Sequence, residues 1–293
     1  MILLTGSTGT VGRALLPQLL KRGDVVRVLV RDPRRLGRRR VDVQLALGDL
    51  ASLGDPHVQR QALRGVDTVI HLAASIRDQP QAPVEELTGL ATARLLRAAE
   101  RMGAERFLFF SAIGANEFQR TRFFRAKALA ERAVANSELE TTIFAPSIVY
   151  DRDDSWVTLM RRLSLLPVLP IAGSGQAAFQ PIWAADASRC VTAVLDGAGA
   201  SRIELAGPET LTYDHMARLI AQASRRERPL VHLPLGLVRA GLVWLRRIVG
   251  DAAFATWEEA ELMEVPMTSK RGDADVRSLG VEPRAMAAVL GAR

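Results

Sequence analysis

Three glycines follow the first apolar run of the chain at a spacing suited to binding phosphates. Gly6, Gly9 and Gly12 recur every third residue, just before a helical pattern begins. In a strand–turn–helix unit, the first glycine permits the tight turn, the second admits a pyrophosphate and the third lets the helix pack on the strand. The helix N-terminus adds free N–H groups and a partial positive charge. We therefore predict dinucleotide contacts from Gly6, Thr8, Gly9, Thr10, Val11, Gly12 and Arg13.

The end of the second apolar run, Val25–Val30, indicates which dinucleotide is preferred. Proteins that use NAD place an acid about 20 residues after the glycine motif, where it contacts the ribose 2′-hydroxyl. Here Arg31 stands nineteen residues after Gly12. A guanidinium matches a 2′-phosphate through two parallel charge-assisted hydrogen bonds, which favours NADP. Asp32 comes next and can cap the following turn, so NAD stays open.

The residues that follow the third and fourth apolar runs should contact the same dinucleotide. Asp49 follows the third run, where a short acid can meet the adenine amino group, although it can instead cap its own loop. After the fourth run, small residues let the strand end press against the cofactor, and we expect His71 to be satisfied by the backbone rather than to be catalytic. The predicted contacts here are Asp49, Leu50, Leu72, Ala73 and Ala74.

The elements that must position these residues alternate between short apolar runs and helical patterns. We expect strands at 2–4, 25–30, 43–47, 68–72, 107–110 and 142–144, with helices near 11–22, 58–64, 84–102 and 122–136. Near-continuously apolar strands separated by helices indicate a parallel sheet covered on both faces. The prediction is an α/β, doubly wound Rossmann domain over 1–150 and a smaller C-terminal substrate lobe over 151–293. Residues 182–206 should return to the Rossmann core.

Composition narrows the class of protein. The chain of 293 residues is 48% hydrophobic and 24% charged, contains a single cysteine, Cys190, and lacks the run of about 20 apolar residues that spans a bilayer. It begins inside its first expected strand, so we expect no leader and a cytoplasmic location. The net charge of +7 comes mostly from arginines, densest at 34–40. We interpret that run as a solvated loop or a phosphate-attracting rim; with no zinc spacing or stacking platform, we predict neither a metal site nor a nucleic-acid partner.

One later segment is apolar around most of its circumference if it is drawn as a helix. Residues 235–249 are interrupted only by Arg239, Arg246 and Arg247. Such a helix packs into the small lobe or contacts a membrane surface or a protein partner, which would place the protein at the periphery of a membrane.

Together these patterns resemble the short-chain dehydrogenase/reductase superfamily, in its extended and atypical branches. The stretches that carry this resemblance are 5–12, 30–33, 48–50 and 71–74. Three more, 145–150, 179–186 and 206–213, are similar to the atypical group related to the nucleotide-binding accessory subunit of respiratory complex I. The resemblance extends to about residue 225. It implies an NAD(P)-binding oxidoreductase in which Lys127 and Pro146 also contact the cofactor.

The resemblance also implies a catalytic serine and a tyrosine four residues before a lysine. Residues i and i+4 share a helix face, so the lysine can lower the pKa of the phenol that exchanges a proton with the substrate carbonyl. Ser111 and Lys127 match this pattern, but Phe123 stands where the tyrosine belongs. Phenylalanine has no exchangeable proton. Tyr150, or water held by Ser111 or Lys127, is the expected replacement.

Three functions remain open on this basis. The first is a reductase with another proton donor, acting on an apolar carbonyl compound or quinone, because 156–168 is rich in Trp, Leu, Met and Val. These residues can equally form lobe core. The second is a nucleotide-binding structural subunit, assembly factor or redox sensor without turnover. The third is an epimerase or dehydratase, which we rank last because that chemistry also uses the missing tyrosine.

Overall fold

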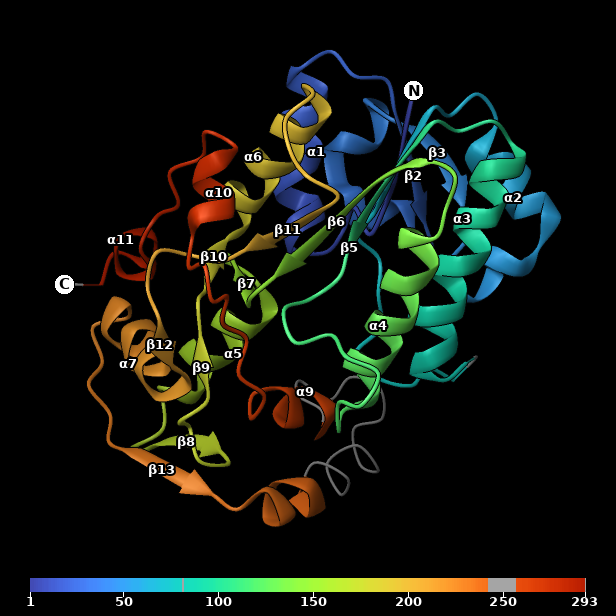
Figure 1. The fold of residues 1–293 in the computed structure, drawn as a ribbon. Helices are drawn as coiled ribbons and strands as arrows, with labels where there is room; N and C mark the ends of the chain where they lie inside the picture. Colours follow the sequence, from blue (N-terminus) through green and yellow to red (C-terminus); the bar gives the residue numbers. More distant parts are fainter. Residues whose placement is uncertain (81, 242–256, 293) are drawn as a thin grey trace.

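The computed structural model describes residues 1–80, 82–241 and 257–292 (Figure 1). Its centre is a seven-stranded parallel sheet with the order β11-β6-β5-β4-β1-β2-β3. The strands are β1 (Ile2–Thr5), β2 (Val26–Val30), β3 (Gln44–Leu47), β4 (Thr68–His71), β5 (Arg106–Phe110), β6 (Glu140–Pro146) and β11 (Arg202–Leu205). The chain builds outward from β1 to β3, then crosses back to β4 on the other side of β1. The predicted doubly wound fold is therefore confirmed.

Helices cover both faces of this sheet, as the apolar strands require. One face packs on α1 (Thr10–Lys21) and α6 (Ala184–Leu195), and the other on α2 (Pro56–Leu63), α3 (Ala91–Arg101) and α4 (Arg122–Ala135) (Figure 1). Alternation along β1 divides the two cores: Leu4 lies in the first and Leu3 in the second, and both are fully buried. The four predicted helices are present. The third begins with a π-helical turn, η3 (Glu85–Leu90), before α3.

Short helical turns connect the strands at the carboxyl edge of the sheet. These are two 3₁₀ segments, η1 (Pro33–Val41) and η2 (Ala51–Gly54). Near the C-terminus, α10 (Ala274–Ser278) packs beside β11, where the Asp275 carboxylate accepts from the Glu204 N–H at 2.9 Å. Residues 182–206 supply α6 and β11, and β11 pairs with β6 in parallel. The boundary between domains at residue 150 stays a prediction.

The C-terminal lobe is built from short elements around an apolar core. Its helices are α5 (Ser155–Leu163), α7 (Tyr213–Ala223), α9 (Trp257–Leu262) and α11 (Met286–Leu290). Its strands form three pairs: β7 (Val149–Tyr150) with β10 (Ile182–Trp183), β9 (Ala178–Phe179) with β12 (Leu211–Thr212), and β8 (Leu169–Ala172) with β13 (Leu230–Leu233). As the sequence indicates, Thr212 caps α7, and its Oγ1 accepts from the His215 N–H at 3.2 Å.

Only part of the apolar segment 235–249 can be placed. Residues 235–241 are helical and mostly exposed, with Leu237 at 67% exposure, whereas 242–249 lie outside the described residues. In the described ranges, no helix is long and apolar enough to cross a membrane. Cys190 is a buried residue of α6, as its apolar surroundings predict.

Candidate functional site

A cleft of about 350 Å³ lies at the carboxyl ends of β1 to β4, where the strand order reverses. Open α/β sheets bind their ligands at this switch point. The residues of the cleft that the sequence predicted are Gly6, Thr8, Gly9, Arg31, Asp49, Leu50, Leu72, Ala73 and Ala74. Thr10, Val11, Gly12, Arg13, Lys127 and Pro146 do not line it.

The glycine loop forms the floor of the cleft. Gly6 has φ +73°, and a Cβ there would lie 2.7 Å from the Ala73 nitrogen. A Cβ on Gly12 would lie 2.2 Å from the Gly6 oxygen, so Gly12 serves the packing of α1 on β1. Gly9 is the N-cap of α1 and supplies no side-chain cap. The first turn of α1 therefore keeps N–H groups for an anionic ligand.

Ser7 indicates that this loop fits a bound dinucleotide. Its side chain is only 3% exposed and lines the cleft, yet its Oγ has no hydrogen-bond partner among the residues that the structure describes. An unpaired buried hydroxyl is costly unless a ligand completes it. A dinucleotide phosphate in the loop would supply the missing acceptor. Sequence reasoning passed over Ser7, although it lies inside the glycine motif.

A basic rim borders the adenosine end. Arg31 lines the cleft together with Asp32 and Arg35. The Asp32 carboxylate accepts from the Arg34 N–H at 2.9 Å and caps η1, as the sequence allowed. Arg35 comes from the arginine run, so part of that run borders the cleft. The contact of Arg31 with a 2′-phosphate stays a prediction.

Asp49 has the loop hydrogen bond that the sequence allowed, and it also lies where a ligand contact is possible. It lines the cleft, and its Oδ1 accepts from the Ser52 N–H at 2.9 Å, which fastens the loop before η2 to its first turn. In return the Ser52 hydroxyl accepts from the Asp49 N–H at 2.7 Å. The loop cap is therefore present, and the adenine contact stays a prediction.

His71, at the end of β4, is completely buried. Its partners are side chains rather than the expected backbone groups: the Thr5 Oγ1 lies 2.7 Å from Nδ1 and the Thr92 Oγ1 lies 3.0 Å from Nε2. That part of our expectation was wrong, because β1 and α3 bring two threonines to the ring. Burial, with a smaller effect from the Lys127 charge, lowers the pKa of His71 to about 3, so the ring is neutral.

Lys127 and Phe123 lie on one face of α4, as their spacing predicts. The Lys127 Nζ is 5.7 Å from the centre of the Phe123 ring and 4.9 Å from that of Phe109. It donates to the Phe110 carbonyl oxygen, and the side chain is only 3% exposed. Burial lowers the pKa of the ammonium to about 7. This amine therefore exchanges its proton near neutral pH.

Ser111 directly follows the carbonyl that Lys127 binds. Its N–H donates to the Phe144 oxygen at 2.7 Å, whereas its Oγ is buried without a partner in the described part of the chain. Pro146 ends β6 nearby and accepts from the Ile113 N–H at 2.8 Å. A polar hydroxyl and an amine thus flank the end of β5, beside the strand that leads to Ala73.

Tyr150 lies in the core of the lobe, with no exposed surface. Its hydroxyl has no hydrogen-bond partner within the described ranges. Burial raises the pKa of this phenol above its usual value, and the carboxylate of Asp186 adds to the rise. A phenol in this state is a poorer proton donor than the Lys127 ammonium.

The cleft also has lining residues that were not among the predicted contacts, from strand ends, loops and η3. They are Thr5, Ser7, Leu29, Val30, Asp32, Arg35, Gly48, Ala51, Ser75, Gln79 and Leu87. For most of them a signal existed, because they lie next to predicted contacts. Ser75 and Gln79 carried none, since only the path of the chain after β4 brings them to the cleft.

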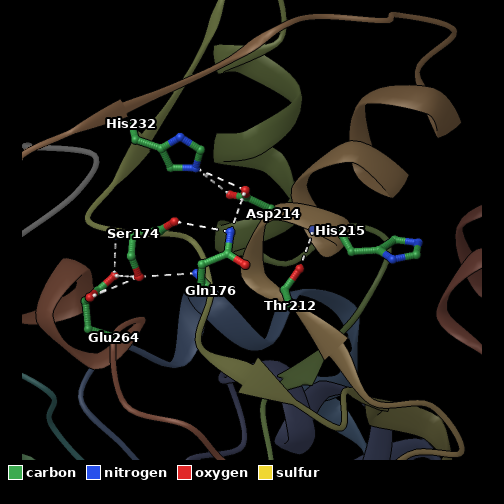
Figure 2. Close-up of polar contacts among 7 residues, drawn as sticks. All are labelled: Ser174, Gln176, Thr212, Asp214, His215, His232 and Glu264. Carbon is green, nitrogen blue, oxygen red and sulfur yellow. Dashed lines mark hydrogen bonds and ion pairs between the residues drawn. The ribbon is translucent and has the colours of Figure 1, made fainter.

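A second gathering of polar side chains lies in the lobe (Figure 2). The His232 Nε2 is 2.9 and 3.0 Å from the two carboxylate oxygens of Asp214, and Gln176 Nε2 donates to one of them at 3.3 Å. Glu264 accepts from the Ser174 N–H at 2.8 Å. The loop 173–176 is thereby fastened to α7, β13 and the residues after α9. Because these groups satisfy one another, we interpret the cluster as a structural clasp.

Comparison with known proteins agrees with this geometry. A family model described as NAD(P)H-binding matches residues 6–166. The mitochondrial NADH dehydrogenase (ubiquinone) 1 alpha subcomplex subunit 9 of Arabidopsis thaliana is 29% identical over 80% of this chain, which spans 60% of that subunit. The (4-alkanoyl-5-oxo-2,5-dihydrofuran-3-yl)methyl phosphate reductase of Streptomyces griseus is 29% identical over 89% of this chain and 86% of its own length.

Among solved structures, the UDP-glucose 4-epimerase of Thermus thermophilus in complex with NAD superposes with a TM-score of 0.74 at 18% identity. The match covers 99% of this chain and 96% of the epimerase. At this identity the likeness shows the fold alone. Cleft, glycine loop and matched family model lead to one conclusion: the chain belongs to the NAD(P)H-binding family and is an atypical protein of the short-chain dehydrogenase/reductase type.

Proposed function

We propose that the protein is an NADPH-dependent reductase of a small apolar carbonyl compound or quinone. The observation that carries the proposal is the buried Lys127 amine, whose pKa near 7 makes it an acid at neutral pH. An ordinary structural lysine would be exposed or form an ion pair. Lys127 is buried on the Phe110 carbonyl, and the charge of Glu131 only partly offsets the lowering of its pKa by burial. The relatives include a reductase that spans most of this chain.

A short path of contacts connects Lys127 to the cleft. Its Nζ lies over the Phe109 ring, and that ring stacks on His71 with the ring centres 5.9 Å apart. His71 immediately precedes Leu72, Ala73 and Ala74 in the cleft wall. The amine thus lies at the end of β5, one strand beyond the β4 wall of the cleft and on the side of β1 away from Arg31.

The chain's own groups divide the chemistry as follows. A bound nicotinamide would supply the hydride. Lys127 holds a transferable proton at Nζ, and the unpaired Ser111 Oγ–H can orient a carbonyl oxygen. Phe109 and Phe123 keep water away from the amine. In this scheme Lys127, rather than Tyr150, takes over the role of the missing tyrosine.

NADPH is the proposed cofactor because two guanidiniums line the adenosine end of the cleft, while the carboxylates of Asp32 and Asp49 there each accept a backbone N–H of their own loop. Arg31 and Arg35 line the cleft there, and Asp32 is turned to cap η1. The apolar substrate is proposed from the residues of the stretch 156–168. Val157 and Met160 are buried in the lobe core, whereas Leu165 and Leu166 are 61% and 46% exposed. Part of the apolar stretch 156–168 therefore forms the core of the lobe.

A second candidate function is nucleotide binding without turnover. Phe123 favours it, because the usual phenol is absent, and so does the likeness to a subunit of a larger complex. In that case the exposed helix 235–241, with Leu237, would be the first place to look for a protein or membrane contact. The likeness to an epimerase concerns the fold and adds nothing to the third alternative.

The decisive experiment is anaerobic incubation of the purified protein and NADPH with a panel of quinones and aldehydes, following nicotinamide absorbance. We expect turnover in the wild type and a loss of about 10² to 10⁴ in rate for Lys127→Ala, the usual worth of general acid catalysis. The exposed Lys270→Ala is the matched control. Tight NADPH binding without oxidation by any compound would favour the second candidate.

A further inference from the structure

We propose that His71 is a positioning residue of the cleft. Through hydrogen bonds it fixes the Thr5 hydroxyl, and with it the Ala73 amide, relative to Ser75. The inference rests on the dinucleotide-binding half of the proposed function and needs no turnover. Both of its ends lie in the cleft, because Thr5, Ala73, Ser75 and Gln79 all line it.

The hydrogen bonds on the Thr5 side allow an assignment in which Nδ1 is the acceptor. The Ala73 N–H donates to Thr5 Oγ1 at 3.3 Å. The Thr5 hydroxyl proton is then free to point at His71 Nδ1, 2.7 Å away, which accepts it. In this assignment Nδ1 carries no proton, and the ring is the Nε2–H tautomer, which the contacts of Nε2 decide.

The bonds on the other side agree with that tautomer. His71 Nε2 is 3.0 Å from Thr92 Oγ1, which in turn donates its own proton to the Thr88 carbonyl at 2.6 Å. The Thr92 oxygen is thus left to accept from Nε2–H. The Thr5 and Thr92 hydroxyls each donate one hydrogen bond and accept one, so this network needs no charged group.

Thr88 carries the network to the far wall of the cleft. Its Oγ1 accepts from the Ser75 N–H and donates to the Ser75 oxygen, both at 3.0 Å. Gln79 Nε2 donates to the Ser75 hydroxyl at 3.4 Å. The π-helical turn η3 contains Thr88, and π turns are frequent at functional sites.

A neutral imidazole suits this role better than any other buried side chain. It accepts on one side and donates on the other, so it can join two hydroxyls that run in the same direction. Its stacking on Phe109 fixes the plane of the ring. The neutral state is kept throughout the physiological range because burial lowers the pKa of His71 to about 3.

Two variants separate positioning from mere packing. In His71→Asn the side-chain oxygen can take the place of Nδ1 and still accept from Thr5. In His71→Gln the amide nitrogen can take the place of Nε2 and still donate to Thr92, but the Thr5 acceptor is lost. Both lose the ring and its stacking, so both should lower the thermal midpoint of the ligand-free protein to a similar extent.

The measurement is the dissociation constant of NADPH, and separately of NADH, by titration calorimetry beside the thermal midpoint. We expect His71→Gln to weaken NADPH binding about tenfold and His71→Asn to weaken it clearly less, the size of one lost hydrogen bond. Thr92→Val should also weaken binding, and Thr92→Ser should restore it. If the His71 variants do not fold, the NADPH affinities of Thr92→Val and Thr92→Ser test the inference instead.

Equal affinities in wild type, His71→Gln and Thr92→Val would overturn the inference, and so would losses that merely follow the thermal midpoint. A wild type that binds neither dinucleotide would overturn the assignment of the cleft as well. Binding with the expected pattern but no turnover would leave the inference standing and remove the reductase proposal.

Discussion

Polar groups beside the nucleotide cleft differ in burial and pairing from those of the clasp in the C-terminal lobe. Near the cleft, Ser7 and Ser111 keep hydroxyls without partners in the described residues, and the Lys127 amine is buried with a carbonyl as its hydrogen-bond acceptor. In the clasp, Asp214 is buried, whereas His232 and Gln176 are exposed, and the three side chains satisfy one another (Figure 2). The lobe core does hold one unpaired buried hydroxyl among the described residues, that of Tyr150. Unsatisfied or desolvated groups are kept where a ligand can complete them. The difference supports our proposal that the chemistry lies in the sheet half and that the clasp has a supporting role.

The largest effect that can sharpen this comparison is a gain of activity. Phe123→Tyr places a phenol one helical turn from the Lys127 amine, which can lower its pKa. Because general acid catalysis is worth about 10² to 10⁴ in rate, reduction of simple aldehydes should rise by up to that factor if the proton donor limits the wild type. Nicotinamide absorbance measures it. Phe118→Tyr, at a 94% exposed position, is the control.

If Phe123→Tyr binds NADPH and places its hydroxyl within reach of a bound carbonyl, yet reduces nothing on the panel, a lost donor cannot explain the chemistry. The clasped lobe would then be the better place to look for function. If Phe118→Tyr raised the rate of aldehyde reduction as much as Phe123→Tyr does, the rise would come from an unrelated effect on folding.

The second test concerns the free energy of unfolding. The folded pKa of Lys127 is about 7 against a usual 10.5, so between these values the unfolded state binds more protons than the folded one. This group's contribution to stability is therefore fully present above pH 10.5 and is lost as the pH falls to 7. Lys127→Met should stabilise the ligand-free protein at pH 7 by a few kcal/mol.

Urea unfolding of wild type, Lys127→Met and the exposed Lys21→Met at pH 7 and pH 9 measures this. We expect the gain of Lys127→Met to shrink at pH 9. Destabilisation by Lys127→Met at both values would mean that the amine is a structural group, and the contrast with the lobe would fail.

The third test probes the rim of the cleft. Arg31→Ala should weaken NADPH binding about tenfold and leave NADH binding nearly unchanged, because only NADPH carries the 2′-phosphate. Calorimetric titration of both cofactors is the measurement, and Arg38→Ala, in the same run but outside the cleft lining, is the matched control. A preference for NADPH that survives in Arg31→Ala, and in the double variant with Arg35→Ala, would exclude this rim as its source.

The smallest expected effect belongs to the clasp. His232→Ala removes two contacts with Asp214 and should lower the free energy of unfolding by about 1 kcal/mol, the worth of a partly exposed hydrogen bond. The affinity for NADPH should not change. His215→Ala is the control, since its ring points away from the cluster (Figure 2). A tenfold change in NADPH affinity in His232→Ala would show that the two halves are coupled.

Local sequence determined the sheet and the glycine loop. Runs of apolar residues between helical patterns specify buried parallel strands, and three glycines at fixed spacing allow only one kind of turn before a helix. Asp32 and Thr212 could be assigned as caps for the same reason, because a cap and its partner lie within three residues. The identity of Arg31, and the absence of a phenol at Phe123, were equally readable.

Only the tertiary structure decided the states of the site residues. Thr5 and His71 are 66 residues apart in sequence, yet they share a hydrogen bond, and the ring that we expected to use backbone partners joins two threonines instead. Whether Lys127 was exposed, or whether Tyr150 could reach solvent, depended on how α4 and the lobe pack. Burial sets a pKa through every group that surrounds the side chain, and those groups come from distant parts of the chain.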